Sequence, residues 1–310
     1  MNNFNMGKFL FKISFYIIGI TAVLLILGSY ADGNTDDDYM HFAVEKPHNI
    51  ILGDSRGAQG IVPSVLKEKL AVPFDNFSLN IVYSPYGRIY LKALKRKLNP
   101  ETKNGIFILT VNPWNLSLNH IVKKEEDFPE EKSPLKNMYF YDMSPNYEYL
   151  LRNYTKSWFK IYTDREEVGR SNTFLHKDGW MEVNVDMNKD SVAARTVVKA
   201  KEYRAMMENY SLSDERLKAL NDIIHYLKDK GTVYLVRIPT SKNLTEIENE
   251  KFPEFNSIMK EVSEKHHLKY YNFADQYSEF QYTDGNHVYK ESSKDLTARI
   301  GDSIRAERKN

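Results

Sequence analysis

The chain has no cysteine among its 310 residues. Disulfide bonds, thiolate metal sites, a cysteine nucleophile and a lipoprotein anchor are therefore excluded. The chain also has no large excess of positive or negative charge, because 43 Lys and Arg residues are balanced by 42 Asp and Glu residues, for a net charge of +1. Such a chain has no general basic field for a nucleic-acid backbone, and no stripe of arginine and aromatic residues replaces one. The sequence therefore predicts no nucleic-acid partner.

Other patterns are missing as well. We find no internal repeat and no low-complexity segment, and the 42% hydrophobic and 27% charged residues are typical of an ordinary globular protein. His266 and His267 are adjacent, but nothing nearby completes a metal-binding set, so we interpret them as structural. We expect no metal and no cofactor.

A long apolar run is present at the N-terminus, over residues 9–28. About 20 helical residues, each rising about 1.5 Å, cross the hydrocarbon core of a bilayer. Lys8 and Lys12 precede the most hydrophobic part, and an acidic stretch begins at Asp32. Basic residues before the span and acidic residues after it predict a cytoplasmic N-terminus. Residues 1–28 are thus predicted to be a single-pass anchor in a bacterial inner membrane, with the rest of the chain periplasmic.

The region after this run leaves one alternative open. Residues 29–31, Ser-Tyr-Ala, offer a weak small-x-small cleavage site, so a cleaved signal peptide and a secreted protein remain the alternative. Residues 29–47 are polar, rich in Asp and without a clear period. This composition predicts a linker that lifts the folded domain off the membrane.

From residue 48 to residue 310 the sequence predicts one α/β domain. Buried strands are predicted at 48–53, 74–79, 105–111, 232–238 and 268–273. Helices are predicted at 62–70, 86–98, 189–230, 255–267 and 289–305. Strand–helix units of this kind imply a three-layer α/β/α, flavodoxin-like fold, in which helices cover both faces of a parallel sheet.

The alternation is interrupted at about residues 113–190. This segment is rich in Pro, Asn, Tyr and charged residues and has no clean period. A loop this long in a compact domain is usually functional or a small subdomain. We predict an insertion near the active face, as either a lid or a docking surface. Ser213 is expected to cap the second half of the helical region that follows.

The most informative segment is 49–57, Asn-Ile-Ile-Leu-Gly-Asp-Ser-Arg-Gly. It reads as a buried strand that runs into a turn, which places Ser55 at the carboxyl end of a strand, where open α/β sheets bind ligands. A serine that opens a helix also gains free backbone N–H groups for an oxyanion. The alternative is that Asp54 and Ser55 only cap the following helix.

A second segment near the C-terminus complements the first. Asp284 and His287 lie three residues apart, separated by Gly285 and Asn286, which allow the chain to turn back. The segment follows the last strand and precedes the last helix. His287 would act as the base for Ser55, with Asp284 orienting its ring. An ordinary surface turn is the alternative.

Three residues are candidates for additional oxyanion donors beside the Ser55 N–H group. Asn112 directly follows the third strand, although an Asn-Pro turn explains it equally. Asn80 and Gly87, which follow the second strand, are the other candidates, and the sequence does not distinguish between them.

Three further residues are candidates for substrate contact. Arg56 can pair with an anionic substrate or with a buried carboxylate in a structural salt bridge. His176 and Trp180 in the insertion can line an acyl or sugar pocket, or pack as a loop that Trp180 anchors.

With these motifs the chain resembles the SGNH/GDSL hydrolase superfamily. Residues 53–55, Gly-Asp-Ser, match its nucleophile block, and Asp284-x-x-His287 matches its acid–base block. Asn112 stands where the oxyanion block belongs, although Val-Asn-Pro departs from the usual Gly-x-Asn-Asp. The resemblance covers about 48–112 and 231–305.

The resemblance implies serine-dependent ester chemistry. The N-terminal anchor and the insertion are similar to those of membrane-anchored O-acyltransferase members of the cell envelope. This likeness implies an acyl ester donor, a glycan or other hydroxyl acceptor, and a membrane-bound O-acyltransferase as partner. An extracytoplasmic deacylating esterase and a non-catalytic envelope scaffold are the alternatives.

Overall fold

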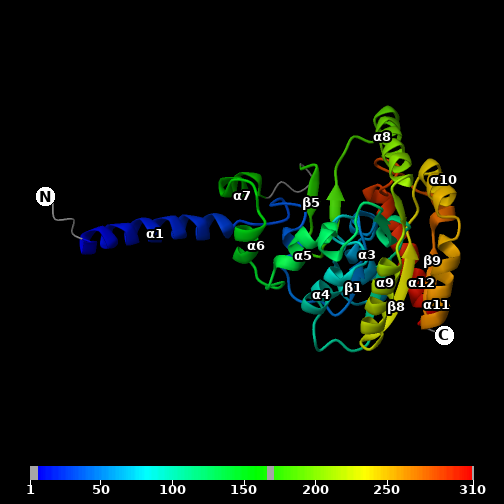
Figure 1. Cartoon of the computed structure of the whole chain (residues 1–310), viewed down its shortest axis with the longest axis horizontal. Helices are drawn as coiled ribbons and strands as arrows, with labels where there is room; N and C mark the ends of the chain where they lie inside the picture. Colours follow the sequence, from blue (N-terminus) through cyan, green and yellow to red (C-terminus); the bar gives the residue numbers. More distant parts are fainter. Residues whose placement is uncertain (1–5, 166–170, 309–310) are drawn as a thin grey trace.

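The computed structural model describes residues 6–165 and 171–308. Figure 1 shows a folded body from which helix α1 (Met6–Gly28) projects. Nearly all side chains of α1 are exposed, and the helix is long and apolar enough to cross a membrane. A membrane anchor and a signal sequence both have these properties.

A five-stranded parallel sheet forms the centre of the body. Its strands are β1 (Ile50–Leu52), β2 (Asp75–Asn76), β3 (Gly105–Thr110), β8 (Gly231–Arg237) and β9 (Lys269–Asn272), in the order β2-β1-β3-β8-β9. The longest register joins β3 to β8, from Gly105 opposite Gly231 to Thr110 opposite Val236. All five predicted strands are confirmed.

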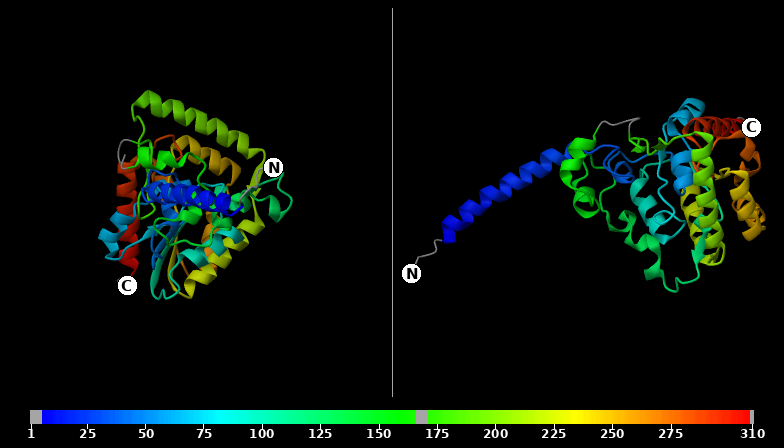
Figure 2. Two further views of the ribbon diagram at one scale, coloured as in Figure 1. Left: turned by 90° about the vertical axis from the view of Figure 1, so that its left-hand side faces the viewer. Right: turned by 90° about the horizontal axis from the view of Figure 1, so that it is seen from above.

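Alternate residues of the strands enter two separate cores, because successive side chains point to opposite faces of a sheet. Leu52 and Leu109 lie in the core covered by α4 (Arg88–Lys97), α9 (Asp214–Lys228) and α11 (Phe255–His266). Ile51 and Ile108 lie in the core covered by α3 (Pro63–Leu70) and α12 (Lys290–Glu307). Figure 2 shows α3 and α12 side by side on their face. The predicted three-layer α/β/α fold is confirmed.

The helical region 189–230 is two helices rather than one. They are α8 (Lys189–Met207) and α9, with the short strand β7 (Tyr210–Leu212) between them. Ser213 is the N-cap of α9, and its hydroxyl accepts a hydrogen bond from the backbone N–H group of Arg216 at 3.3 Å. The predicted cap is confirmed. Two helices, α2 (Ser55–Gly60) and α10 (Lys242–Lys251), were not predicted as separate elements.

The predicted insertion consists of short elements. Strand β4 (Ser117–Asn119) pairs with β7, and β5 (Thr173–Leu175) pairs with β6 (Met181–Val183) in an antiparallel hairpin. Its helices are α5 (Pro134–Asn137), α6 (Tyr147–Arg152) and α7 (Trp158–Asp164). Five 3-10 helices occur in the described parts of the chain: Tyr39–Phe42, Trp114–Leu116, Glu125–Asp127, Pro129–Lys132 and Ala274–Glu279.

The prediction of a linker over residues 29–47 is wrong for residues 39–43. Residues 39–43 are buried, and Phe42 stacks on Tyr149 with ring centroids 5.3 Å apart. The segment is a short run of apolar and aromatic residues, but the acidic residues before it made the whole region look polar in the sequence. Because burial of such side chains stabilises the fold, the segment packs into the core instead of remaining extended.

Candidate active site

Ser55 is the first residue of α2, directly after a tight turn that follows β1. Gly53 makes this turn with φ at +155°, and a Cβ atom there would lie 1.7 Å from Thr110 Oγ1, so only glycine fits. Asp54 is the N-cap of α2, and its Oδ1 accepts a hydrogen bond from the Arg56 N–H group at 3.0 Å. Since Asp54 does the capping, the Ser55 hydroxyl is left for another partner.

That partner is a histidine from the other end of the folded region. Ser55 Oγ lies 2.9 Å from His287 Nε2. The other ring nitrogen, His287 Nδ1, lies 3.0 Å from Asp284 Oδ2. A carboxylate can only accept, so Nδ1 carries the proton and Nε2 is the acceptor for the serine hydroxyl. The structure therefore places the three residues in the order that nucleophile activation requires.

The turn that holds His287 is closed by the same carboxylate. Asp284 Oδ1 accepts from the backbone N–H groups of Asn286 and His287, both at 2.9 Å, and Gly285 adopts φ of +81° between them. Burial raises the pKa of Asp284, but the hydrogen bond and charge of His287 and the two backbone N–H groups outweigh it. The net result is a pKa well below the usual range, so Asp284 is ionised.

Asn286, which the sequence presented only as turn material, also contacts the histidine. Its Nδ2 lies 3.1 Å from His287 Nε2. Its Oδ1 accepts from Arg56 Nε at 2.8 Å and from the Tyr203 hydroxyl at 2.7 Å. Two donors thus fix the orientation of the amide, which directs its N–H group toward the His287 ring.

Arg56 therefore belongs to a buried network. It forms an ion pair with Glu248 of α10, and both side chains are only 3% exposed. Glu248 also accepts from Arg237 Nη2 at 3.1 Å and from Trp114 Nε1 at 2.9 Å. Burial raises the pKa of Glu248, but the two arginines outweigh it and lower the pKa below its usual value. Of the two interpretations of Arg56 from the sequence, the structure matches the structural salt bridge, and the expectation of substrate contact is corrected. No sequence pattern singled out Glu248.

One of the candidate oxyanion donors, Asn80, lines the same cavity as Ser55. Its Oδ1 accepts from the backbone N–H groups of Val82 at 2.9 Å and Tyr83 at 3.0 Å, so its orientation is fixed by its own turn. The Ser55 backbone N–H group lies in the first turn of α2, where helices leave such groups without an internal acceptor. Ser55 and Asn80 thus both line the cavity, and the role of these donors in holding an oxyanion stays a prediction.

The other two candidates are placed differently. Asn112 is buried, does not line the cavity, and donates through Nδ2 to Asp54 Oδ2 at 2.7 Å. Its amide holds the cap of α2 in place. Gly87 is the N-cap of α4, and its Cα faces the buried ion pair of Arg216 with Glu130. An oxyanion contact by either residue stays a prediction.

His176 and Trp180 pack at the turn of the β5–β6 hairpin. Their rings stack with centroids 4.8 Å apart, His176 Nε2 lies 2.9 Å from Glu182 Oε2, and Trp180 Nε1 donates to the Gln59 carbonyl at 3.1 Å. His176 lines a different cavity from Ser55. Both residues thus anchor the hairpin, as the packed-loop alternative predicted, and substrate contact by either residue stays a prediction.

A cavity of about 350 Å³ opens over the serine. The residues that line it are Asp37, Asp38, Ser55, Gln59, Leu79, Asn80, Thr173, Met181, Val183, Val185, Arg195, Thr283, Asp284 and His287. One wall thus comes from the insertion and another from the acidic run predicted as linker. Burial, and then the charges of Asp36 and Asp37, raise the pKa of Asp38 well above its usual value.

No group of three or more His, Cys, Asp or Glu residues that would hold a metal occurs in the parts of the chain that the structure describes. No protein-family model matches the chain, and no curated protein matches it.

Among solved structures, the chain is similar to a lipase/acylhydrolase from Enterococcus faecalis, with 14% identity and a TM-score of 0.40 over 83% of this chain and 95% of that one. It is also similar to Est24, a carbohydrate acetylesterase from Sinorhizobium meliloti, with 10% identity and a TM-score of 0.37 over 83% of this chain and 97% of that one. At TM-scores this low, neither likeness bears on the chemistry, which rests on the distances above. The chain combines a parallel α/β/α sheet with a Gly-Asp-Ser turn and a C-terminal Asp-x-x-His turn in hydrogen-bonding order, which are the features on which its resemblance to the SGNH/GDSL superfamily rests.

Proposed function

We propose that the chain is a serine acyltransferase that forms an acyl-Ser55 intermediate and passes the acyl group to a hydroxyl group of a cell-envelope polysaccharide. The observation that carries the proposal is the 2.9 Å contact between Ser55 Oγ and His287 Nε2, with Asp284 behind the ring at 3.0 Å. Residues 232 positions apart meet at hydrogen-bonding distance and face a cavity. A turn that served only to cap a helix would not need this second partner.

In the first half of the reaction, Ser55 Oγ attacks the carbonyl carbon of an acyl ester and its proton moves to His287 Nε2. The negative charge on the carbonyl oxygen is met by the Ser55 backbone N–H group and by the Asn80 amide. Collapse of the tetrahedral intermediate breaks the ester bond. The leaving alkoxide takes the proton from His287, and the acyl group stays on Ser55.

In the second half, an acceptor hydroxyl group loses its proton to His287 as its oxygen attacks the acyl carbon. Collapse then returns the proton from His287 to Ser55 Oγ and releases the new ester. Asp284 stays ionised throughout and stabilises the charged imidazolium. If water is the acceptor, the same steps release the free acid, and the chain is an esterase.

Two features favour transfer to an envelope glycan over hydrolysis. The apolar helix α1 suits an anchor that keeps the domain beside the membrane and its envelope substrates. The insertion supplies Thr173, Met181 and Val183 to the wall of the cavity, which gives the site a surface for a second substrate. In this proposal a membrane-bound O-acyltransferase supplies the acyl donor, and a glycan hydroxyl group is the acceptor.

The first experiment tests the nucleophile. The full chain in detergent is treated with p-nitrophenyl acetate and analysed by mass spectrometry for one added acetyl group on Ser55. Ser55→Ala should lose this label, whereas Ser64→Ala, which changes an exposed serine of α3, should keep it. Equal labelling of Ser55→Ala and the unchanged chain would remove Ser55 from its role and leave the scaffold alternative.

The second experiment separates transfer from hydrolysis. An activated ester and an excess of a soluble oligosaccharide are incubated with the enzyme, and both products are measured over time. Acylated oligosaccharide that depends on Ser55 supports transfer. Free acid alone, at every acceptor concentration, identifies the chain as a deacylating esterase.

A further inference from the structure

A group of large apolar and aromatic side chains is exposed on the insertion, away from the catalytic cavity. They belong to α6, α7 and the segment before α6, and we call this surface the α6–α7 face. Its most exposed members are Leu151 at 70%, Tyr139 at 69% and Phe159 at 60%. Phe140 and Met143, which follow Tyr139 in the sequence, are exposed as well. Isolated exposed apolar residues are ordinary, but a cluster of this kind marks a surface with a partner.

The exposure of these residues does not come from poor packing of the insertion. The same helices also carry well-packed apolar side chains, with Leu150 of α6 and Ile161 of α7 buried at 1% and 2% exposure. Helices α6 and α7 therefore carry apolar side chains toward the protein on one side and toward the surroundings on the other. Such a pattern suits helices that lie between the protein and an apolar medium.

The α6–α7 face lies at the base of α1. The Tyr147 hydroxyl of α6 donates to the Leu25 carbonyl at 2.6 Å, and the rings of Tyr30 and Tyr162 are 5.1 Å apart in an edge-to-face arrangement. Gly28 at the end of α1 sits so close to α6 that a Cβ atom there would lie 2.5 Å from the Tyr147 ring. In Figures 1 and 2 both helices flank the point where α1 enters the body.

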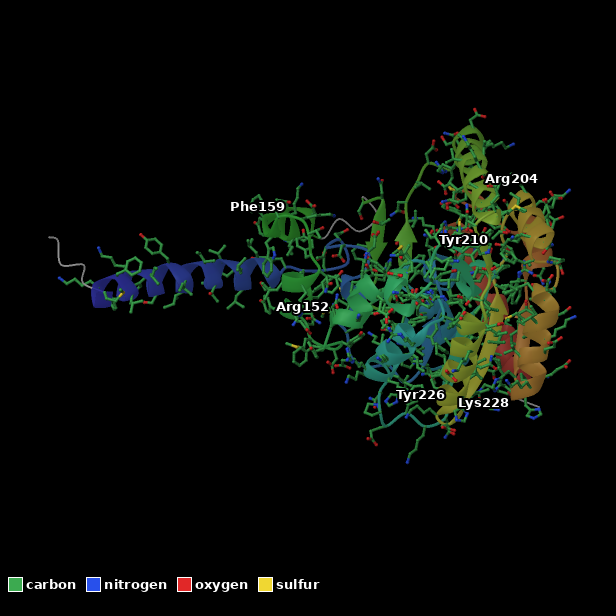
Figure 3. The ribbon with its side chains drawn as sticks, in the orientation of Figure 1. Arg152, Phe159, Arg204, Tyr210, Tyr226 and Lys228 are labelled. Atoms are coloured by element: carbon green, nitrogen blue, oxygen red, sulfur yellow. The ribbon has the colours of Figure 1, made fainter. Side chains whose placement is uncertain are left out.

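The chemistry of the face suits the water–lipid boundary. Tyr and Trp are enriched at this depth of a membrane, and Lys and Arg extend from there to the headgroups. The face combines Tyr139 and Phe159 with Arg152 and Lys160, and the Arg152 guanidinium lies 5.6 Å from the Tyr139 ring centre. Figure 3 labels Phe159 and Arg152 near the base of α1.

We propose that the α6–α7 face lies in the interfacial layer of the same bilayer that α1 crosses. The inference depends on α1 spanning that membrane and not on the serine chemistry. The occupant is lipid rather than another protein because the face continues from the end of a helix that is itself long enough to span a bilayer. The insertion then provides a second contact with the membrane. It holds the body in one orientation and sets the height of the cavity above the lipid surface.

The absence of cysteine makes a direct test possible, because each introduced cysteine is the only labelling site. The full chain is labelled with an environment-sensitive NBD fluorophore at Phe159→Cys or Leu151→Cys and reconstituted into phosphatidylcholine vesicles. Val198→Cys is the matched control, since Val198 is 57% exposed and belongs to α8, a helix that lies away from α1 in Figure 1. Ile18→Cys reports on α1 itself.

The proposal predicts that labels at 151 and 159 shift to shorter emission wavelength on reconstitution and are quenched by nitroxide lipids. The label at 198 should stay quenchable by aqueous iodide and unaffected by the nitroxide lipids. A lipid-quenched label at 18 together with water-exposed labels at 151 and 159 would overturn the inference and leave the anchor intact. Labels at 151 and 159 that neither quencher reaches would indicate a protein partner and overturn it too. A water-exposed label at 18 would overturn the anchor, and the inference with it.

Discussion

The buried carboxylate of Glu248 offers the sharpest test of how the site is supported. Glu248→Gln keeps the shape of the side chain and one acceptor oxygen but removes the negative charge. In the native chain this charge faces Arg56 and Arg237, and the three side chains are only 2–3% exposed. In the variant the two guanidinium groups remain buried and close together, without the carboxylate that compensates them.

Removing one partner of a buried ion pair costs about 3–5 kcal/mol, because the remaining charge stays out of water without compensation. For a domain of this size, 1 kcal/mol moves Tm by about 2–4 °C, so we expect Glu248→Gln to lower Tm on the order of 10 °C. Activity should fall as well, since Arg56 no longer fixes Asn286 beside His287. Displacement of a catalytic group by about 1 Å lowers the rate by up to about 100-fold.

The assay is thermal unfolding of the full chain in detergent, followed by circular dichroism, together with ester turnover well below the Tm of the variant. Glu250→Gln is the control. It lies on the same helix, is exposed, and is 3.9 Å from its nearest cation, Arg204. We expect its effect to stay within about 0.5 kcal/mol. Equal Tm values for Glu248→Gln and Glu250→Gln would refute the view that this carboxylate holds the network together.

Single residues give three further predictions. Asp284→Asn should lower kcat by about ten-thousand-fold in an ester assay, because the ring loses its tautomer preference, and a fall of less than about tenfold would contradict this role. Burial, with the charge of a nearby lysine, lowers the pKa of His41 from 6.5 to about 3. Between these two pH values the imidazole is protonated in the unfolded chain but not in the folded chain. In urea unfolding, the stability of the unchanged chain relative to His41→Gln should therefore fall by about 1.4 kcal/mol per pH unit below 6.5, and an equal pH dependence of the two chains would refute this. Gly179→Ala should lower stability by at least about 1 kcal/mol and speed proteolysis of the β5–β6 hairpin, because φ is +80° and a Cβ atom would lie 2.0 Å from the Asn76 carbonyl oxygen. The control is Gly19→Ala, where a Cβ atom would have no neighbour within 4 Å. Equal behaviour of the two variants would contradict the close contact at Gly179.

The elements that sequence patterns predicted well are those whose local composition agrees with their tertiary environment. The strands before Ser55 and Asn112 are continuous apolar runs, because helices cover both faces of the sheet. The Gly-Asp-Ser turn was recognisable because each of its residues has a local role. Gly53 makes the tight turn, Asp54 caps the helix, and Ser55 presents its hydroxyl to the cavity.

The errors arise where a residue's role depends on a distant partner. The segment 39–43 looked like part of a polar linker because acidic residues precede it, and only its packing against Tyr149 and its neighbours shows it to be core. Asn112 and Gly87 follow the expected strands, but the Asn112 side chain bonds to Asp54 and the Gly87 Cα faces the Arg216–Glu130 ion pair. No local pattern reports such contacts.

The sequence alone determined the class of fold, the apolar N-terminal helix, and the pairing of a Gly-Asp-Ser turn with an Asp-x-x-His turn, because periodicity and turn chemistry are local properties. Only the tertiary structure decided that Arg56 joins Glu248 and Asn286 instead of facing the cavity, and that residues 37 and 38 line it. Those outcomes depend on which side chains the folded chain brings within a few ångströms, and on how much water it leaves around them.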